Sequence, residues 1–134
     1  MTDFDEVEVT TTLVQATGEA AAVAYPDWTY GVSTRVLPSR GVGTTIVVAY
    51  QGSEGKVADL WDHRDLKRLI RKSSTALLDA QGVECMGLKC TVARSGQFRI
   101  EYSYDIDEAI KWANEVFSGL PPAELVEVLR PRDL

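Results

Sequence analysis

Histidine and cysteine are scarce in this sequence, which has one His and two Cys among 134 residues. His63 has no second histidine near it, and neither cysteine lies at metal-ligand spacing from it, so we predict no metal site and no cofactor. Cys85 and Cys90 form one pair at most, and we expect two reduced, buried thiols.

Cations are also in the minority. The sequence has 14 Lys and Arg residues and 20 Asp and Glu residues, so its net charge is −6. That balance argues against direct nucleic-acid binding, which needs cations against phosphates, and favours a basic protein partner.

Long apolar runs are absent as well. No stretch of the sequence is apolar enough to cross a membrane, and the acidic first residues do not have the pattern of a signal peptide. We therefore expect a cytoplasmic protein with no membrane partner. With 45% hydrophobic residues, residues 1–134 are predicted to form one domain that buries about two thirds of its unfolded surface.

The clearest structural pattern is a hairpin over residues 87–104. Apolar and polar residues alternate on both sides of Ser95-Gly96, as expected for two half-buried antiparallel strands joined by a tight turn. The predicted apolar face consists of Leu88, Cys90, Val92, Phe98, Ile100, Tyr102 and Tyr104. Because an isolated hairpin is only marginally stable, other strands and helices must cover this face.

The remaining elements follow from periodicity and from turn residues. We predict helices over 5–24 and 63–81, one from Asp105 or Asp107 to 117, and a short one from Pro121-Pro122. The predicted strands are 28–36, which alternates as a half-buried strand does, 44–50, and a short one over 56–61, with a loop at 38–43. The fold class is therefore α+β, in the order α-β-β-β-α-β-β-α-α, with helices packed on one face of a mainly antiparallel sheet of about five strands.

The search for chemistry leaves two open interpretations of one acidic group. Glu101, Asp105, Asp107 and Glu108 lack the glycine and the spacing of a calcium loop. They are explained by helix capping and the helix dipole, by an acidic patch that faces a partner, or by both. His63 is typical of an exposed residue in the first turn of a helix, and no catalytic residue is predicted.

Several local patterns resemble the YezG-like immunity proteins, which are antitoxins of secreted polymorphic and contact-dependent inhibition toxins. The helix that runs into Tyr25-Pro26-Asp27-Trp28 is similar to that family's first helix, which ends in a Pro-acidic-Trp step. The segment from Ser95 to Asp105 is similar to its Gly-Lys-Phe-Lys-Ile-x-Tyr-x-Tyr-Asp signature. The resemblance covers about Leu13 to Asp105, and residues 106–134 look like a C-terminal helical extension.

The resemblance implies a protein that is not an enzyme. It implies an immunity protein that binds and neutralises a cognate toxin domain, which we expect to be a basic nuclease. The candidate partner-binding residues are Glu101, Tyr102, Tyr104, Asp105, Asp107 and Glu108. Whether the protein forms homo-oligomers is left open.

Two alternatives come from other classes of protein. The order of elements also resembles that of type III secretion chaperones, which are small, acidic and dimeric and bind extended effector segments. A small enzyme that uses His63 with a carboxylate is the other alternative, although the sequence suggests no substrate for it.

Overall fold

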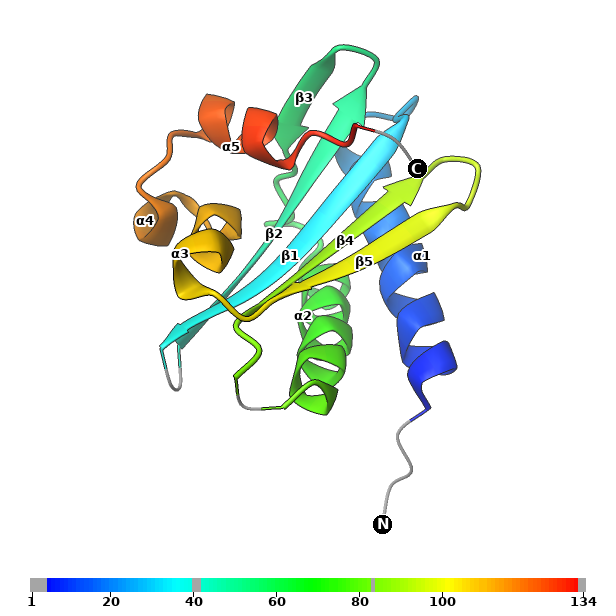
Figure 1. Cartoon of the computed structure of the whole chain (residues 1–134). Helices are drawn as coiled ribbons and strands as arrows, with labels where there is room; N and C mark the ends of the chain where they lie inside the picture. The colour runs from blue at the N-terminus through cyan, green and yellow to red at the C-terminus, as the bar shows by residue number, and fades with distance from the viewer. Residues whose placement is uncertain (1–4, 40–41, 83, 133–134) are drawn as a thin grey trace.

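The computed structural model describes residues 5–39, 42–82 and 84–132. Within these residues the chain forms an antiparallel sheet of five strands in the order β3-β2-β1-β4-β5, flanked by helices (Figure 1). The strands are β1 Tyr30–Ser39, β2 Val42–Gln51, β3 Glu54–Val57, β4 Gly87–Ala93 and β5 Phe98–Ser103. The helices are α1 Glu6–Ala24, α2 Arg64–Ala80, α3 Ile106–Ala109, the 3₁₀ helix η1 Ile110–Trp112, α4 Glu115–Ser118 and α5 Pro122–Leu129. The predicted α+β class and element order are confirmed.

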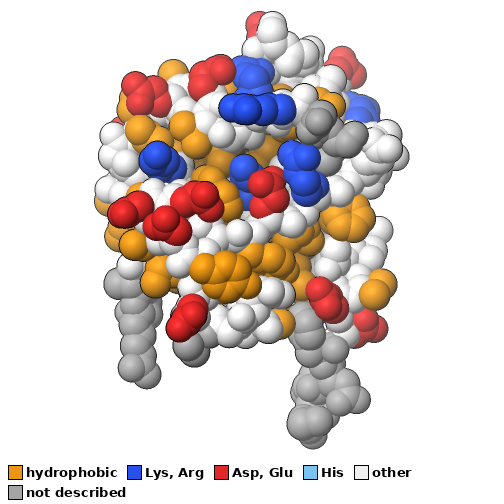
Figure 2. Space-filling view, in the orientation of Figure 1, with side chains coloured by type: hydrophobic (Ala, Val, Ile, Leu, Met, Phe, Trp, Pro, Cys, Tyr) orange, Lys and Arg blue, Asp and Glu red, His pale blue; other side chains and the backbone are white. Residues whose placement is uncertain are grey.

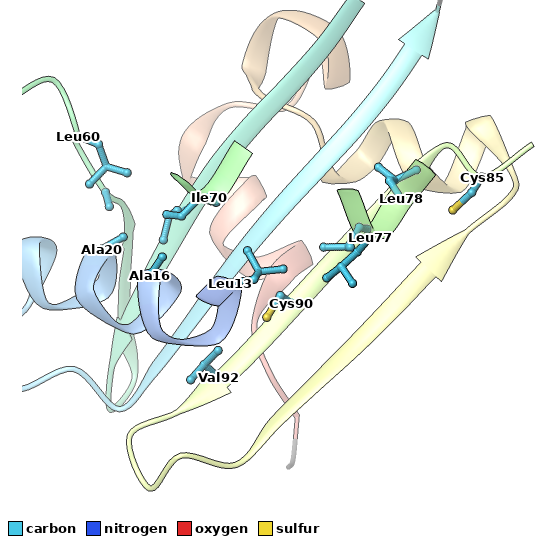
Figure 3. Close-up of a cluster of buried hydrophobic side chains, with 13 residues drawn as sticks. Leu13, Ala16, Ala20, Leu60, Ile70, Leu77, Leu78, Cys85, Cys90 and Val92 are labelled. Atoms are coloured by element: carbon cyan, nitrogen blue, oxygen red, sulfur yellow. The ribbon is translucent and has the colours of Figure 1, made fainter. Parts of the chain in front are cut away.

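The first core lies between α1, α2 and one face of the sheet. Figure 3 shows its side chains gathered between α1 and the sheet. Its fully buried members include Leu13, Ala16 and Ala20 from α1, Ile70, Leu77 and Leu78 from α2, and Val47, Leu88 and Cys90 from the sheet. The two helices therefore pack against most of the predicted apolar face of the hairpin, but Phe98 and Tyr104 of that face are exposed.

The second core lies on the opposite face of the sheet, under the C-terminal helices. It contains Val32, Val36, Val48 and Tyr50 from the strands and Ala109, Trp112, Ala113, Val126 and Leu129 from the helical segments. The expectation that all helices cover one face is therefore wrong. The sheet is covered on both faces because residues 106–129 return across β1 and β2 (Figure 1).

Strand β1 was expected to be half-buried, but both of its faces are covered. Val32 faces the second core, and Gly31 and Ser33 face α1. The hydroxyl groups of Thr17 and Ser33 are hydrogen-bonded at 2.7 Å. Small and hydroxyl-bearing residues let α1 pack closely against β1. The face of β1 that is directed toward α1 is therefore buried although it is not apolar.

The register of the hairpin agrees with the predicted alternation. Cys90 pairs with Ile100, and Leu88 with Tyr102. Four residues, 94–97, connect the strands, and Gly96 adopts a φ of +99° that favours glycine. The hairpin that we predicted is therefore confirmed, with β5 as an edge strand of the sheet. The expectation that both strands are half-buried is wrong for β4, which is buried on both faces because it lies between β1 and β5 and under helices.

Several boundaries differ from the predictions; the first strand, predicted over 28–36, spans Tyr30–Ser39. The third strand was predicted over 56–61, but it spans Glu54–Val57. The predicted loop 38–43 is shorter, since strands occupy its ends, and its tip at 40–41 lies outside the described residues. The predicted single helix up to residue 117 is broken after Trp112, because Asn114 is extended and caps α4 by accepting a hydrogen bond from the backbone N–H of Phe117.

Candidate functional site

The first two predicted contact residues, Glu101 and Tyr102, lie on opposite faces of β5. The Glu101 carboxylate lies 3.7 Å from Lys89 Nζ and 3.2 Å from Arg99 Nε. Tyr102 packs against the first core, and burial raises the pKa of its hydroxyl. The six predicted residues therefore do not form one continuous surface.

The remaining four predicted residues lie together where β5 leads into α3. Tyr104 is 54% exposed, and its hydroxyl is hydrogen-bonded to Gln81 Oε1 at 3.2 Å. Asp105 is the cap of α3, because its carboxylate accepts a hydrogen bond from the backbone N–H of Asp107 at 2.9 Å. Asp107 and Glu108 are exposed, and no ion pair recorded among the described residues includes them. Capping therefore explains Asp105. We refer to Tyr104, Asp107 and Glu108, which are exposed and close in sequence, as the acidic patch; Tyr104 is bonded to the end of α2, and the two carboxylates lie on α3.

The acidic patch belongs to a larger negative region. Glu115 in α4 is also exposed. Figure 2 shows acidic side chains gathered on the part of the surface where Figure 1 draws α3 and α4. Next to them, Val116 is 83% exposed.

His63 precedes the first residue of α2 and is exposed. Its side chain makes no cap hydrogen bond to the helix. Among the residues that the structure describes, no group of three or more His, Cys, Asp or Glu is placed to hold a metal ion.

A groove beside β3 was not predicted from the sequence. Its volume is about 360 Å³, and its lining includes Ile46, Val57, Trp61, Arg64 and Lys67. Trp61 is 71% exposed and has the Arg64 guanidinium 4.7 Å above its ring. The sequence predicted Trp61 at the end of the third strand, whereas it lies after that strand and before α2. No pattern in the sequence marked it as exposed.

Strand β2 continues past the end of β3 at this groove. The carbonyl of Val47 accepts a hydrogen bond from Ala58 N at 2.8 Å on the β3 side, whereas the carbonyl of Tyr50 accepts one from Thr29 N on the β1 side. By strict alternation, the backbone groups of Thr45 also point toward the β3 side. Since β3 pairs only with residues 48–51 of β2, no described strand pairs with Thr45 on that side.

A second hollow lies between β4, β5 and the end of α5, with a volume of about 410 Å³. Its lining is Lys89, Thr91, Arg99, Glu101 and residues 128–132. Figure 2 shows basic side chains close together in the upper part of the face that carries these strands. We refer to this site as the cationic hollow.

Both cysteines are buried and free, as predicted. Burial raises the pKa of the Cys90 thiol from 9.0 to about 12. Burial also raises the pKa of Cys85, whose sulfur lies 3.7 Å from the carbonyl oxygen of Gly87. Neither thiol has the low pKa of a reactive cysteine.

No protein-family model matches the chain, and no curated protein is significantly similar to it. Among the described residues, no helix has both the length and the apolar character needed to span a membrane.

Proposed function

We propose that this protein acts by binding another protein, as an immunity protein that neutralises the toxic domain of a polymorphic or contact-dependent inhibition effector. The observation that supports this proposal is the acidic patch of Tyr104, Asp107 and Glu108. It combines an aromatic side chain held by Gln81 with two exposed carboxylates that the fold does not use in ion pairs.

The chemistry of the patch suits a basic partner. A nuclease domain carries cations for the phosphates of its substrate, and exposed carboxylates attract such a surface over a distance set by the ionic strength. An aromatic residue that is already partly ordered loses little entropy when it is buried in an interface. We therefore expect fast, salt-sensitive association in which Tyr104 becomes buried.

The first experiment tests the proposed class of function. The chain is co-expressed with the C-terminal domain of a large secreted protein encoded beside it, and cell growth is measured. The proposal predicts that the domain alone stops growth and that the chain restores it. The absence of such a neighbouring gene, or toxicity that the chain does not relieve, would contradict the proposal.

The second experiment tests the surface. Asp107 and Glu108 are both changed to Lys, and Asp105 is kept because it caps α3. The matched control changes the exposed Glu19 and Glu54 to Lys, which alters the net charge by the same amount. We expect the first variant to weaken toxin binding at low salt by about tenfold or more relative to the control. Equal affinities for the two variants would remove this patch from the interface.

A second candidate function is supported by the open edge of β2. A chaperone-like protein that binds extended effector segments needs unpaired strand backbone, and the backbone groups of Thr45 have the required direction beside an apolar groove. The mass of the complex in solution separates the two functions. A dimer that holds an unfolded segment favours the chaperone, and a stoichiometric complex with a folded toxin domain favours immunity.

The open edge has its own test. A Thr45→Pro variant removes an N–H group that points away from β1, so the pairing of β1 with β2 is retained. A Thr44→Pro variant removes an N–H group that points toward β1 and serves as the destabilised comparison. If Thr45→Pro folds and still binds an effector segment with unchanged affinity, strand addition at β2 is excluded.

A further inference from the structure

We propose that the cationic hollow binds a small anion that carries several phosphate groups. This inference is independent of the proposed function, since the hollow and the acidic patch consist of different residues. It is based on the convergence of cations, on the way the fold holds two of them, and on the local excess of positive charge.

The cations of the hollow come from separate parts of the chain. Lys89 lies on β4, Arg99 on β5, and Arg130 and Arg132 follow the end of α5. The fold brings these cations to one concave site, where Glu101 and Glu127 form ion pairs with three of them.

Two of these cations are held in place by aromatic rings. The side chain of Lys89 is 17% exposed, and its ammonium group lies 4.9 Å from the centre of the Trp112 ring. The side chain of Arg130 is 29% exposed, lies 5.1 Å over the ring of Tyr50, and donates two hydrogen bonds to Glu127, at 3.1 and 2.7 Å. Because the fold already orders both side chains, an anion that binds them does not need to immobilise two flexible groups.

The positive charge of the hollow exceeds its negative charge. Four of the nine described residues that line the hollow are cations, Lys89, Arg99, Arg130 and Arg132, and one is acidic, Glu101, in a protein whose net charge is −6. A concave site of one sign concentrates ions of the opposite sign. The surplus indicates that the preferred ligand is anionic.

The size and donors of the hollow favour phosphate over a single carboxylate. A volume of about 410 Å³ accommodates more than one anionic group. Guanidinium groups bind phosphate oxygens through paired N–H donors, and an ammonium group adds a point charge. Thr91, which is 2% exposed and carries a hydroxyl group, also lines the hollow.

The test uses isothermal titration calorimetry of the full chain with sodium tripolyphosphate as the probe. Inorganic phosphate and ATP are titrated in parallel, to separate a preference for free phosphate groups from a preference for a nucleotide. Citrate is the carboxylate comparison. We expect saturable, salt-sensitive binding of tripolyphosphate that is tighter than binding of citrate. No saturable binding at millimolar concentration, or equal affinity for citrate, would overturn the assignment.

Variants then locate the site. Lys89→Gln and Arg132→Gln are each expected to weaken tripolyphosphate binding by about tenfold. Lys72→Gln, on the exposed face of α2, removes the same charge outside the hollow and is expected to leave the affinity unchanged. If Lys89→Gln unfolds, the test is still decisive, because Arg132 is exposed and its substitution leaves both cores intact. An equal loss of affinity in Arg132→Gln and Lys72→Gln would show that only the overall charge matters and would overturn the proposed site.

Discussion

The hydroxyl of Tyr50 donates a hydrogen bond to the backbone carbonyl of Val126 at 2.7 Å, across a sequence separation of 76 residues. Tyr50 lies in β2 and is 1% exposed, and Val126 lies in α5. A second bond of the same kind joins Thr34 in β1 to the carbonyl of Trp112 at 2.8 Å. Two side-chain hydroxyls of the sheet therefore hold the C-terminal helices over the second core and satisfy carbonyl groups that helix ends leave unpaired.

Removal of the Tyr50 hydroxyl should destabilise the protein measurably. Tyr50→Phe leaves the carbonyl of Val126 without this donor in a buried site, and we expect the free energy of unfolding to fall by about 1–3 kcal/mol. Urea denaturation measures the change. The control is Tyr104→Phe, whose hydroxyl is exposed, with an expected loss of about 0.5 kcal/mol or less. Equal values for the two variants would show that this bond does not anchor α5.

The stability of the protein should decrease at alkaline pH because of Cys90. Its pKa is 9.0 when the chain is unfolded and about 12 when the fold buries it. Between these values the folded state binds more protons than the unfolded state, so the stabilisation is complete below pH 9 and is lost as the pH rises toward 12. Burial also raises the pKa of Tyr50, which adds an effect of the same sign at higher pH.

A Cys90→Ala variant isolates the contribution of this thiol. Its free energy of unfolding is measured by urea denaturation at several pH values on both sides of the unfolded pKa. We expect its alkaline slope to be less steep than that of the original protein by up to about 1.4 kcal/mol per pH unit. The slope is decisive even if the variant is less stable overall, and an unchanged slope would contradict the prediction.

The packing of α1 on β1 should not tolerate a larger residue at position 31. A Cβ atom added to Gly31 would lie 2.9 Å from the Cβ of Ala21 and 3.3 Å from the carbonyl oxygen of Thr17. We expect Gly31→Ala to cost about 1–3 kcal/mol in thermal or urea unfolding. At Gly43 the three atoms nearest to the added one all belong to the guanidinium of Arg35, at the end of a flexible side chain. Gly43→Ala should therefore cost about 1 kcal/mol or less, and a larger effect there than at Gly31 would contradict this account.

Capping and partner binding can be separated at the start of α3. Asp105→Ala removes the carboxylate that accepts the N–H of Asp107, and the expected loss of stability is about 1 kcal/mol. Asp107→Ala keeps that bond and should cost about 0.5 kcal/mol or less. Denaturation curves of both variants test the assignment, and a loss at Asp107 as large as that at Asp105 would refute it.

Parts of the candidate site could have been predicted more fully from the sequence. The alternation of β5 already places Glu101 and Tyr102 on opposite faces, so the two could not belong to one contact surface. Asp105 was correctly included among the possible helix caps, because a cap depends on the two or three residues that follow it. The exposure of Trp61 had no comparable signal, since it depends on where β3 ends and on how α2 packs.

The sequence by itself determined the features that depend on neighbouring residues. These are the α+β class, the order of the elements, the hairpin with its turn at Gly96, and the apolar faces of the two long helices. Only the tertiary structure decided that residues 106–129 cover the second face of the sheet and that Lys89 and Arg130 share one hollow. Each of these outcomes depends on contacts between residues far apart in the chain, whose proximity is set by strand order and by the packing of layers.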